Sequence, residues 1–167
     1  MAPRGPWIAV VGPRNADPAE LAEAEEAGAA VAAAGAILVC GGLGGVMAAA
    51  SRGARSGGGI TVGLLPGTAR DDANAWVVVA LPTGLGEGRN ALIVRAADAV
   101  VAVGGGWGTL SEIALALRAG LPVVGVGTWQ LARGGAPVDG VVAAPDGRSA
   151  VEEALRRLGH VTQPRVP

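Results

Sequence analysis

The sequence predicts a doubly wound α/β domain with a mostly parallel sheet of about six or seven strands flanked by helices. Apolar runs of strand length alternate with helix-like segments along the whole chain of 167 residues. These runs are near-continuous rows of Val, Ile, Leu and Ala, which is typical of strands covered by helices on both faces. Half of the residues are hydrophobic and only 16% are charged, which excludes a disordered chain.

The first three elements have clear sequence signals. Trp7–Val11 is an apolar run that predicts a strand. Asp17 suits the N-cap of the following helix, with proline in the first turn and Glu20 completing a capping box. Gly35 suits the end of this helix. Ala36–Cys40 is then the second expected strand.

The same alternation continues to the end of the chain. Further strands are expected at Ile60–Leu65, Trp76–Leu81, Ala99–Val103, Pro122–Val126 and Val141–Ala144, and further helices within Gly41–Ser56, Glu87–Ala97, Gly108–Ala119 and Ser149–Leu158. We find no linker that would divide the chain, so we expect one domain over residues 1–162. The Pro-rich end at residues 163–167 is compatible with a disordered tail.

The absence of lysine limits the chemistry that the chain can perform. All 13 basic residues are arginine, so a pyridoxal phosphate Schiff base, Schiff-base aldolase chemistry and a Walker A lysine are excluded. The single Cys40 and the single His160 cannot form a zinc site or a disulfide within the chain. We therefore expect no metal and no cofactor, and a buried Cys40 because it lies in an apolar run.

Charge and hydropathy indicate where the protein works. The net charge of −1 gives no general electrostatic reason to bind nucleic acid. The longest weakly polar runs, such as Ala27–Cys40, are broken by glycine, and Met1–Pro6 lacks the apolar core of a signal peptide. We expect a cytoplasmic protein that binds neither nucleic acid nor a membrane.

Glycine-rich turns follow the expected strands. The turns begin at Gly12, span Gly41–Gly45 and span Gly104–Thr109, and the last two lead directly into helices. Glycines allow the backbone to approach a ligand closely, and a helix start supplies free N–H donors and a positive dipole. A phosphate is the expected ligand. The alternative is that these glycines only make tight strand-to-helix turns.

A mononucleotide fits the spacing of these glycines better than a dinucleotide does. The GxGxxG pattern fails because its third glycine position is occupied by Thr109 in one turn and by Met47 in the other. The acidic residue that would bind a ribose hydroxyl after the second strand is also missing, since Cys40 leads into glycine.

Three polar residues could line the same cleft. Thr109 and Glu112 lie one turn apart on an expected helix, so they could contact a bound sugar phosphate, or they could form a capping box without chemistry. Arg89 stands just before an apolar helix and could serve as a partner for a phosphate or a leaving group. The alternative is an exposed arginine at a helix start, where the dipole makes it mildly unfavourable.

Several of these residues match the motifs of a known family. Gly104–Glu112 (GGGWGTLSE) resembles the PGGxGTxxE signature of the Lonely Guy family, whose members are phosphoribohydrolases acting on cytokinin nucleotides. Gly41–Met47 looks like the family's GGGxxGLM segment, and Gly12–Arg14 sits at its first nucleotide-contacting turn. Arg89 precedes the signature at the spacing that the family's catalytic arginine keeps.

The resemblance implies a Rossmann-like nucleotide-binding domain that hydrolyses the N-glycosidic bond of a nucleoside 5′-monophosphate, giving free base and ribose 5-phosphate. In that reaction Glu112 would bind the ribose and stabilise an oxocarbenium-like transition state, and Arg89 would assist departure of the base. The residues expected to bind the nucleotide and its phosphate are Gly12, Pro13, Arg14, Gly42, Gly44, Gly105, Gly106, Trp107, Gly108 and Thr109.

The sequence departs from the family pattern at three places. Gly104 replaces the proline of the signature, Ser111 replaces a glutamate beside Glu112, and Glu87–Asn90 replaces a HERK-like segment. These features resemble a neighbouring branch of SLOG-type Rossmann proteins, the molybdenum cofactor carrier proteins, which share the fold but bind rather than cleave. A non-catalytic binding or carrier protein for molybdenum cofactor or another phosphorylated ligand is therefore the alternative function.

The apolar surface of the chain indicates self-association. The expected helix Glu87–Ala97 is apolar over too broad a set of positions for one core-facing stripe, so we expect a homo-oligomer that covers its other side. The resemblance likewise implies dimers through helices of this region. Trp107 could be a lid on the ligand or an oligomer contact. The base stays unnamed, because the expected pocket walls at residues 82–88 and 129–137 carry no readable pattern.

Overall fold

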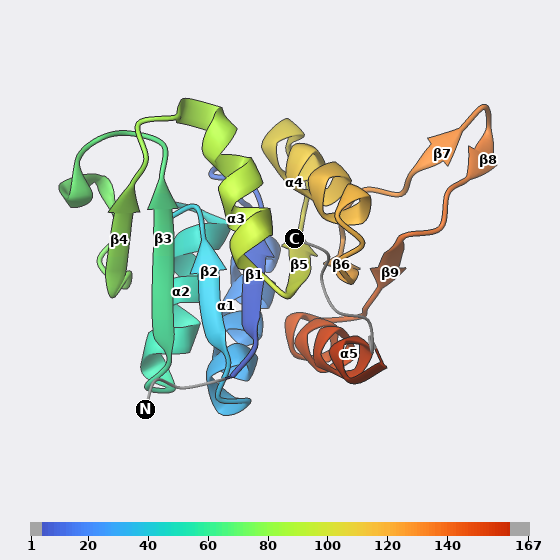
Figure 1. Ribbon diagram of the computed structural model, residues 1–167. Helices are drawn as coiled ribbons and strands as arrows, with labels where there is room; N and C mark the ends of the chain where they lie inside the picture. Colours follow the sequence, from blue (N-terminus) through green and yellow to red (C-terminus); the bar gives the residue numbers. More distant parts are fainter. Residues whose placement is uncertain (1–4, 161–167) are drawn as a thin grey trace.

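The computed structural model describes residues 5–160 and is built around one parallel sheet. Its strands are β1 (Trp7–Val11), β2 (Ile37–Cys40), β3 (Ile60–Leu65), β4 (Val79–Pro82), β5 (Ala99–Val103), β6 (Val123–Val126) and β9 (Val141–Ala143). They lie in the order β4-β3-β2-β1-β5-β6-β9, and every neighbouring pair is parallel (Figure 1). The predicted α/β class is confirmed.

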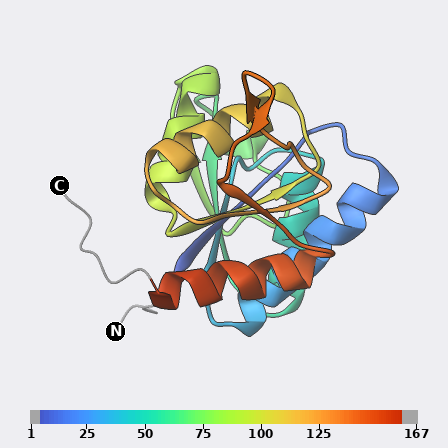
Figure 2. The same cartoon turned by 90° about the vertical axis from the view of Figure 1, so that its right-hand side faces the viewer.

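Helices cover both faces of this sheet. They are α1 (Pro18–Ala33), α2 (Val46–Ser56), α3 (Asn90–Ala96), α4 (Trp107–Arg118) and α5 (Gly147–His160). Helices α1, α2 and α5 lie on one face, and α3 and α4 lie on the other (Figure 2). The chain passes to the second face of the sheet after β4 and returns to the first face with α5. The turns before α2 and α4, on opposite faces, both follow the carboxyl ends of central strands.

The core has two halves because successive side chains of a strand point to opposite faces. In β1, the side chains of Ile8 and Val10 pack with α1, α2 and α5, whereas those of Ala9 and Val11 pack with α3 and α4. All four are at most 2% exposed. This two-sided burial explains the unbroken apolar sequence of the strands, and Cys40 is buried in the first half as expected.

The start of α1 is fixed by the predicted capping box. The Asp17 carboxylate accepts a hydrogen bond from the backbone N–H of Glu20 at 2.8 Å, and the Glu20 carboxylate accepts one from the N–H of Asp17 at 2.9 Å. Further along, α1 meets α2 at backbone distance, since a Cβ on Gly28 would lie 1.9 Å from the carbonyl oxygen of Ala50. These contacts fix the loop between β1 and α1 relative to α2.

Most bounds differ from the expected ones by at most two residues, and two elements differ more. The strand predicted over Trp76–Leu81 begins only at Val79, because the Thr61 hydroxyl donates to the carbonyl of Trp76 and accepts from the N–H of Val78, which holds the preceding segment in a turn. The helix predicted over residues 87–97 is divided into a 3-10 turn, η2 (Gly86–Arg89), and α3.

Some elements carried no recognised sequence signal. These are the 3-10 turn η1 (Arg70–Asp72) and the short antiparallel hairpin of β7 (Ala132–Arg133) and β8 (Ala136–Pro137). The hairpin extends away from the sheet beside α4 (Figure 1). The tail expected at residues 163–167 lies outside the described residues.

Candidate functional site

A hollow of about 410 Å³ lies at the carboxyl ends of β1, β2 and β5. This is where the strand order changes direction, since β1 has β2 on one side and β5 on the other. Ligands of open α/β sheets bind at such a switch point. The predicted site residues that line the hollow are Gly12, Pro13, Arg14, Arg89, Gly106, Gly108, Thr109 and Glu112.

Other parts of the chain also line this hollow. Residues that the sequence did not place among the site residues are Val11, Asn15, Gly41, Leu43, Met47, Pro66, Gly86, Glu87 and Asn90. Gly86 and Glu87 belong to the expected wall at residues 82–88, whereas the lining includes none of the described residues 129–137. Apolar lining residues such as Leu43 and Met47 carry no signal that would distinguish them from core residues.

Four predicted site residues are absent from the lining, and local packing gives the reason for three of them. Gly42 has a φ of 75°, and a Cβ there would meet the Leu65 side chain at 2.7 Å. A Cβ on Gly105 would lie 2.8 Å from the indole nitrogen of Trp129. Trp107 is 80% exposed and stacks on Trp129, with ring centroids 5.3 Å apart. The fourth is Gly44.

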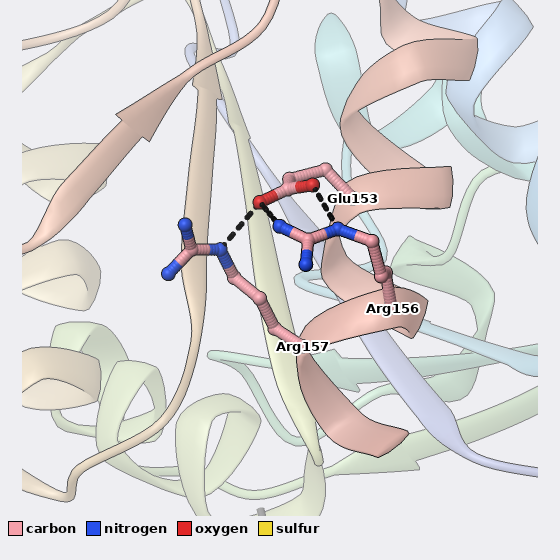
Figure 3. A network of polar contacts seen from close by, with 3 residues as sticks. All are labelled: Glu153, Arg156 and Arg157. Atoms are coloured by element: carbon pink, nitrogen blue, oxygen red, sulfur yellow. Dashed lines mark hydrogen bonds and ion pairs between the residues drawn. The ribbon is translucent and has the colours of Figure 1, made fainter. Parts of the chain in front are cut away.

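Two further hollows differ in character from the candidate site. One, of about 680 Å³, lies between the starts of α1 and α2 and shares Arg14 and Asn15 with the candidate site. The other, of about 590 Å³, lies at the amino end of β6 and includes Arg156 and Arg157 of α5. Both of these arginines bond to Glu153 (Figure 3), and these bonds lower the pKa of Glu153 to about 2. Neither hollow contains the glycine turn before α4.

Helix α4 begins with free backbone donors at the candidate site. Its N-cap is Gly106, and no side chain caps it. The capping-box interpretation of Thr109 and Glu112 is therefore wrong, because Thr109 already lies in the first turn. The N–H groups of the first turn lack partners within the helix and carry the positive end of its dipole. This arrangement suits an anion.

The Thr109 hydroxyl and two glycines add to this donor set. Thr109 is 2% exposed, and its Oγ1 makes no hydrogen bond to any of the described residues. Gly106 and Gly108 have no positive φ, and a Cβ there would lie 3.9 Å from the Pro13 and Asn90 side chains, respectively. The backbone conformation does not require glycine at these two positions, which both line the hollow.

Arg89 is 8% exposed, so the interpretation as a solvent-exposed arginine at a helix start is wrong. Its Nη2 donates to the carbonyl oxygen of Gly41 at 3.4 Å, and its Nη1 donates to the side-chain oxygen of Asn90. Burial lowers the pKa of Arg89, and the nearby Glu112 carboxyl opposes this shift. Arg89 thus connects the turn before α2 with the start of α3.

Glu112 is a buried carboxyl, 6% exposed, on the pocket side of α4. Burial raises its pKa from 4.5 to about 8, although the charge of Arg89 acts in the opposite direction. The protonated form of this side chain is therefore favoured at neutral pH. A protonated carboxyl can donate a hydrogen bond to a ligand but cannot stabilise a positive centre by charge.

Among residues 5–160, we find no group of three or more His, Cys, Asp or Glu side chains that could hold a metal ion. Within the same residues, no helix combines the length and apolar character needed to cross a bilayer.

The fold and the hollow define a Rossmann-like protein with a ligand site at the topological switch point. A model of the SLOG cluster4 family matches residues 6–147, and the chain belongs to this family. The resemblance to SLOG-type proteins seen in the sequence is confirmed.

Two solved structures are similar to this chain over more than nine tenths of its length. The molybdenum cofactor binding protein of the phototrophic bacterium Rippkaea orientalis superposes with a TM-score of 0.83 and 34% identity, over 93% of this chain and 98% of that one. The molybdenum cofactor carrier protein of Chlamydomonas reinhardtii gives a TM-score of 0.82 and 36% identity, over 94% and 99% of the two chains. Both likenesses extend over nearly the whole fold.

A curated relative is also similar in sequence. An uncharacterized protein of Archaeoglobus fulgidus is 42% identical over 113 residues, which are 68% of this chain and 74% of that protein. Family, fold and pocket together support a ligand-binding protein of the SLOG type.

Proposed function

We propose that the protein binds molybdenum cofactor, a phosphorylated pterin, and carries it without cleaving it. The observation that carries this proposal is the uncapped start of α4, which joins free N–H donors, the unpartnered Thr109 hydroxyl and the open space at Gly106 and Gly108. The two solved structures named as binding or carrying this cofactor supply the chemical class of the ligand.

The phosphate of the cargo would lie on the first turn of α4. Backbone N–H groups and a hydroxyl are suitable donors for a phosphate, and the helix dipole favours its charge. No lysine is needed, and Arg14 lines the same hollow as a source of positive charge. The molybdenum belongs to the cargo, so the protein itself needs no metal ligands for this role.

The state of Glu112 favours carrying over cleavage. A glycosidic bond that breaks through an oxocarbenium-like transition state is stabilised by a nearby carboxylate. Burial favours the protonated form of Glu112 at neutral pH, which reduces that charge, whereas its proton can serve as a donor to a ligand oxygen or nitrogen.

The phosphoribohydrolase remains a second candidate because of one specific observation. Arg89 and Glu112, the two residues that the Lonely Guy resemblance makes catalytic, line the same hollow as the phosphate-binding turn. A substrate that supplied donors to Glu112 would lower its pKa and could restore the carboxylate.

One paired experiment distinguishes the carrier function from the hydrolase function. The protein is mixed with molybdenum cofactor released from a molybdoenzyme and gel-filtered, and the bound cofactor is measured by reconstituting a cofactor-free molybdoenzyme. In parallel, the protein is incubated with AMP, and adenine is measured by chromatography. We expect retained cofactor and no adenine. Release of adenine by the natural protein, but not by Glu112→Gln, would show that the protein is a hydrolase and would contradict the carrier function.

Thr109→Val provides a matched variant for the binding arm. It removes the unpartnered hydroxyl but keeps the shape of the side chain, so the melting temperature should stay the same or rise. Loss of one hydrogen bond to a charged group should weaken cofactor binding about 10-fold. Unchanged binding by Thr109→Val would show that the phosphate lies elsewhere.

A further inference from the structure

A chain of side-chain hydrogen bonds connects Arg89 with the first turn of α4. Arg89 Nη1 donates to Asn90, whose Nδ2 donates to the hydroxyl of Ser111 at 3.1 Å, and this hydroxyl donates to the carbonyl oxygen of Gly108 at 2.7 Å. Asn90 and Ser111 are far apart in sequence, and both are positions where the chain departs from the motifs that it resembles. The structure brings the two departures into direct contact.

The chemistry of the groups sets the direction of this chain. A guanidinium has only donors, so Asn90 must turn its oxygen toward Arg89 and its nitrogen toward Ser111. The Ser111 hydroxyl then accepts from Asn90 and donates to the carbonyl of Gly108, which can only accept. Because the first donor is charged and each bond polarises the next, the chain restricts the guanidinium more than one neutral bond would.

The remaining contacts complete the restraint on Arg89. Its Nη2 donates to the carbonyl of Gly41, which lies in the turn between β2 and α2. Its Nε is buried and makes no hydrogen bond to any described residue. Both terminal nitrogens of the guanidinium therefore bond to the protein, and the Nε–H is left for an acceptor from outside the described residues.

We propose that Asn90 and Ser111 are positioning residues that hold the Arg89 guanidinium against the first turn of α4, so that its Nε–H is directed to the bound ligand. This inference rests on the proposed function for the nature of that ligand. Removing either residue should release Arg89 and weaken ligand binding, although neither residue needs to touch the ligand.

A double-mutant cycle tests the proposal. The probe is the stable, fluorescent pterin phosphate obtained by oxidising molybdenum cofactor, and affinity is measured by fluorescence titration. Asn90→Ala and Ser111→Ala should each weaken binding about 10-fold, and the double variant should lose little more than either single variant, because both break the same chain. Additive losses, or unchanged affinities, would overturn the proposal.

Two further variants separate positioning from general stability. Ser111→Thr keeps the hydroxyl and should retain the affinity of the natural protein. Ser149→Ala removes a half-buried serine from the first turn of α5, outside the hollow, and should leave the affinity unchanged. Loss of affinity in either variant would indicate a structural effect and would contradict the proposal.

A second readout does not depend on ligand binding. In protein labelled with ¹⁵N-arginine, the Nε–H signal of Arg89 is identified by its absence in Arg89→Lys. Its hydrogen exchange should be slow in the natural protein and faster in Asn90→Ala and Ser111→Ala at unchanged melting temperature. Equal exchange rates in the natural protein and the two variants would refute the positioning role, even if no probe binds. Failure of the natural protein to bind the probe would instead refute the proposed function.

Discussion

Glu112 is a buried ionisable residue of the candidate site, and its burial makes the stability of the protein depend on pH. In the folded protein burial raises its pKa to about 8, whereas in the unfolded chain it titrates near 4.5. Between these pH values the folded state binds more protons than the unfolded state does. The contribution of Glu112 to the free energy of unfolding should therefore fall as pH rises from 4.5 to about 8, and stay constant above.

This pH dependence is measurable by chemical denaturation at several pH values, with Glu112→Gln as the control. The glutamine cannot ionise, so the stability of the variant should exceed that of the natural protein by an amount that grows with pH, on the order of a few kcal/mol at pH 8. Parallel stability curves for the two proteins would mean that the pKa of Glu112 is the same in the folded and the unfolded protein.

At the residue scale, three polar residues singled out from the sequence lie together in the structure. Arg89, Thr109 and Glu112 line one hollow, as their spacing indicated. Trp107 is not among the residues that line this hollow, and the direction of a side chain at a helix start depends on where the helix begins and on what it packs against. Its partner Trp129 comes from the loop after β6, which no local pattern connects with the glycine turn.

At the scale of elements, the start of α4 makes a prediction about Gly108. A Cβ at this position meets no close neighbour in the empty site, and alanine favours a helix over glycine by up to about 1 kcal/mol. Gly108→Ala should therefore keep or raise the melting temperature. The added methyl group occupies space beside the first-turn donors, so binding of the pterin phosphate should fall at least about 10-fold.

Gly159→Ala is the matched control for this prediction. Gly159 also lies in a helix, α5, and a Cβ there would meet no atom within 4 Å. This variant should gain stability by the same mechanism and bind the ligand normally. Equal affinities of Gly108→Ala and Gly159→Ala, measured by fluorescence titration, would contradict the phosphate position on α4.

Most strands and helices could be predicted because the sheet is buried on both faces, which leaves unbroken apolar runs separated by glycine turns. The exceptions depend on contacts between distant residues. The late start of β4 follows from hydrogen bonds of Thr61, and the pair β7 and β8 is too short to show periodicity. The division of residues 86–96 into η2 and α3 likewise has no signal in an apolar helical pattern.

For the whole molecule, the exposed apolar side chains predict self-association. Leu92 on α3 is 39% exposed, and Val79 and Leu81 on the edge strand β4 are 41% and 43% exposed. We expect a homodimer that covers Leu92, with a mass in light scattering about twice the 16.2 kDa of the chain. A mass of one chain at micromolar concentration would reject this expectation.

Substitution of an exposed apolar residue by glutamate tests which surface forms the dimer interface. Leu92→Glu should give a monomer, because an unpaired carboxylate is costly to bury between subunits. Val138→Glu changes a side chain of similar exposure, 40%, on the segment after β8 and should stay dimeric. Dissociation by Val138→Glu but not by Leu92→Glu would place the interface elsewhere.

The central claim is that the protein recognises its ligand through a phosphate on the first turn of α4. The most direct test is to titrate the protein with the pterin phosphate derived from molybdenum cofactor, before and after a phosphatase has removed the phosphate. The phosphorylated form should bind at least about 100-fold more tightly, since several charge-assisted hydrogen bonds are lost with the anion. Equal affinities of the two forms would contradict the claim.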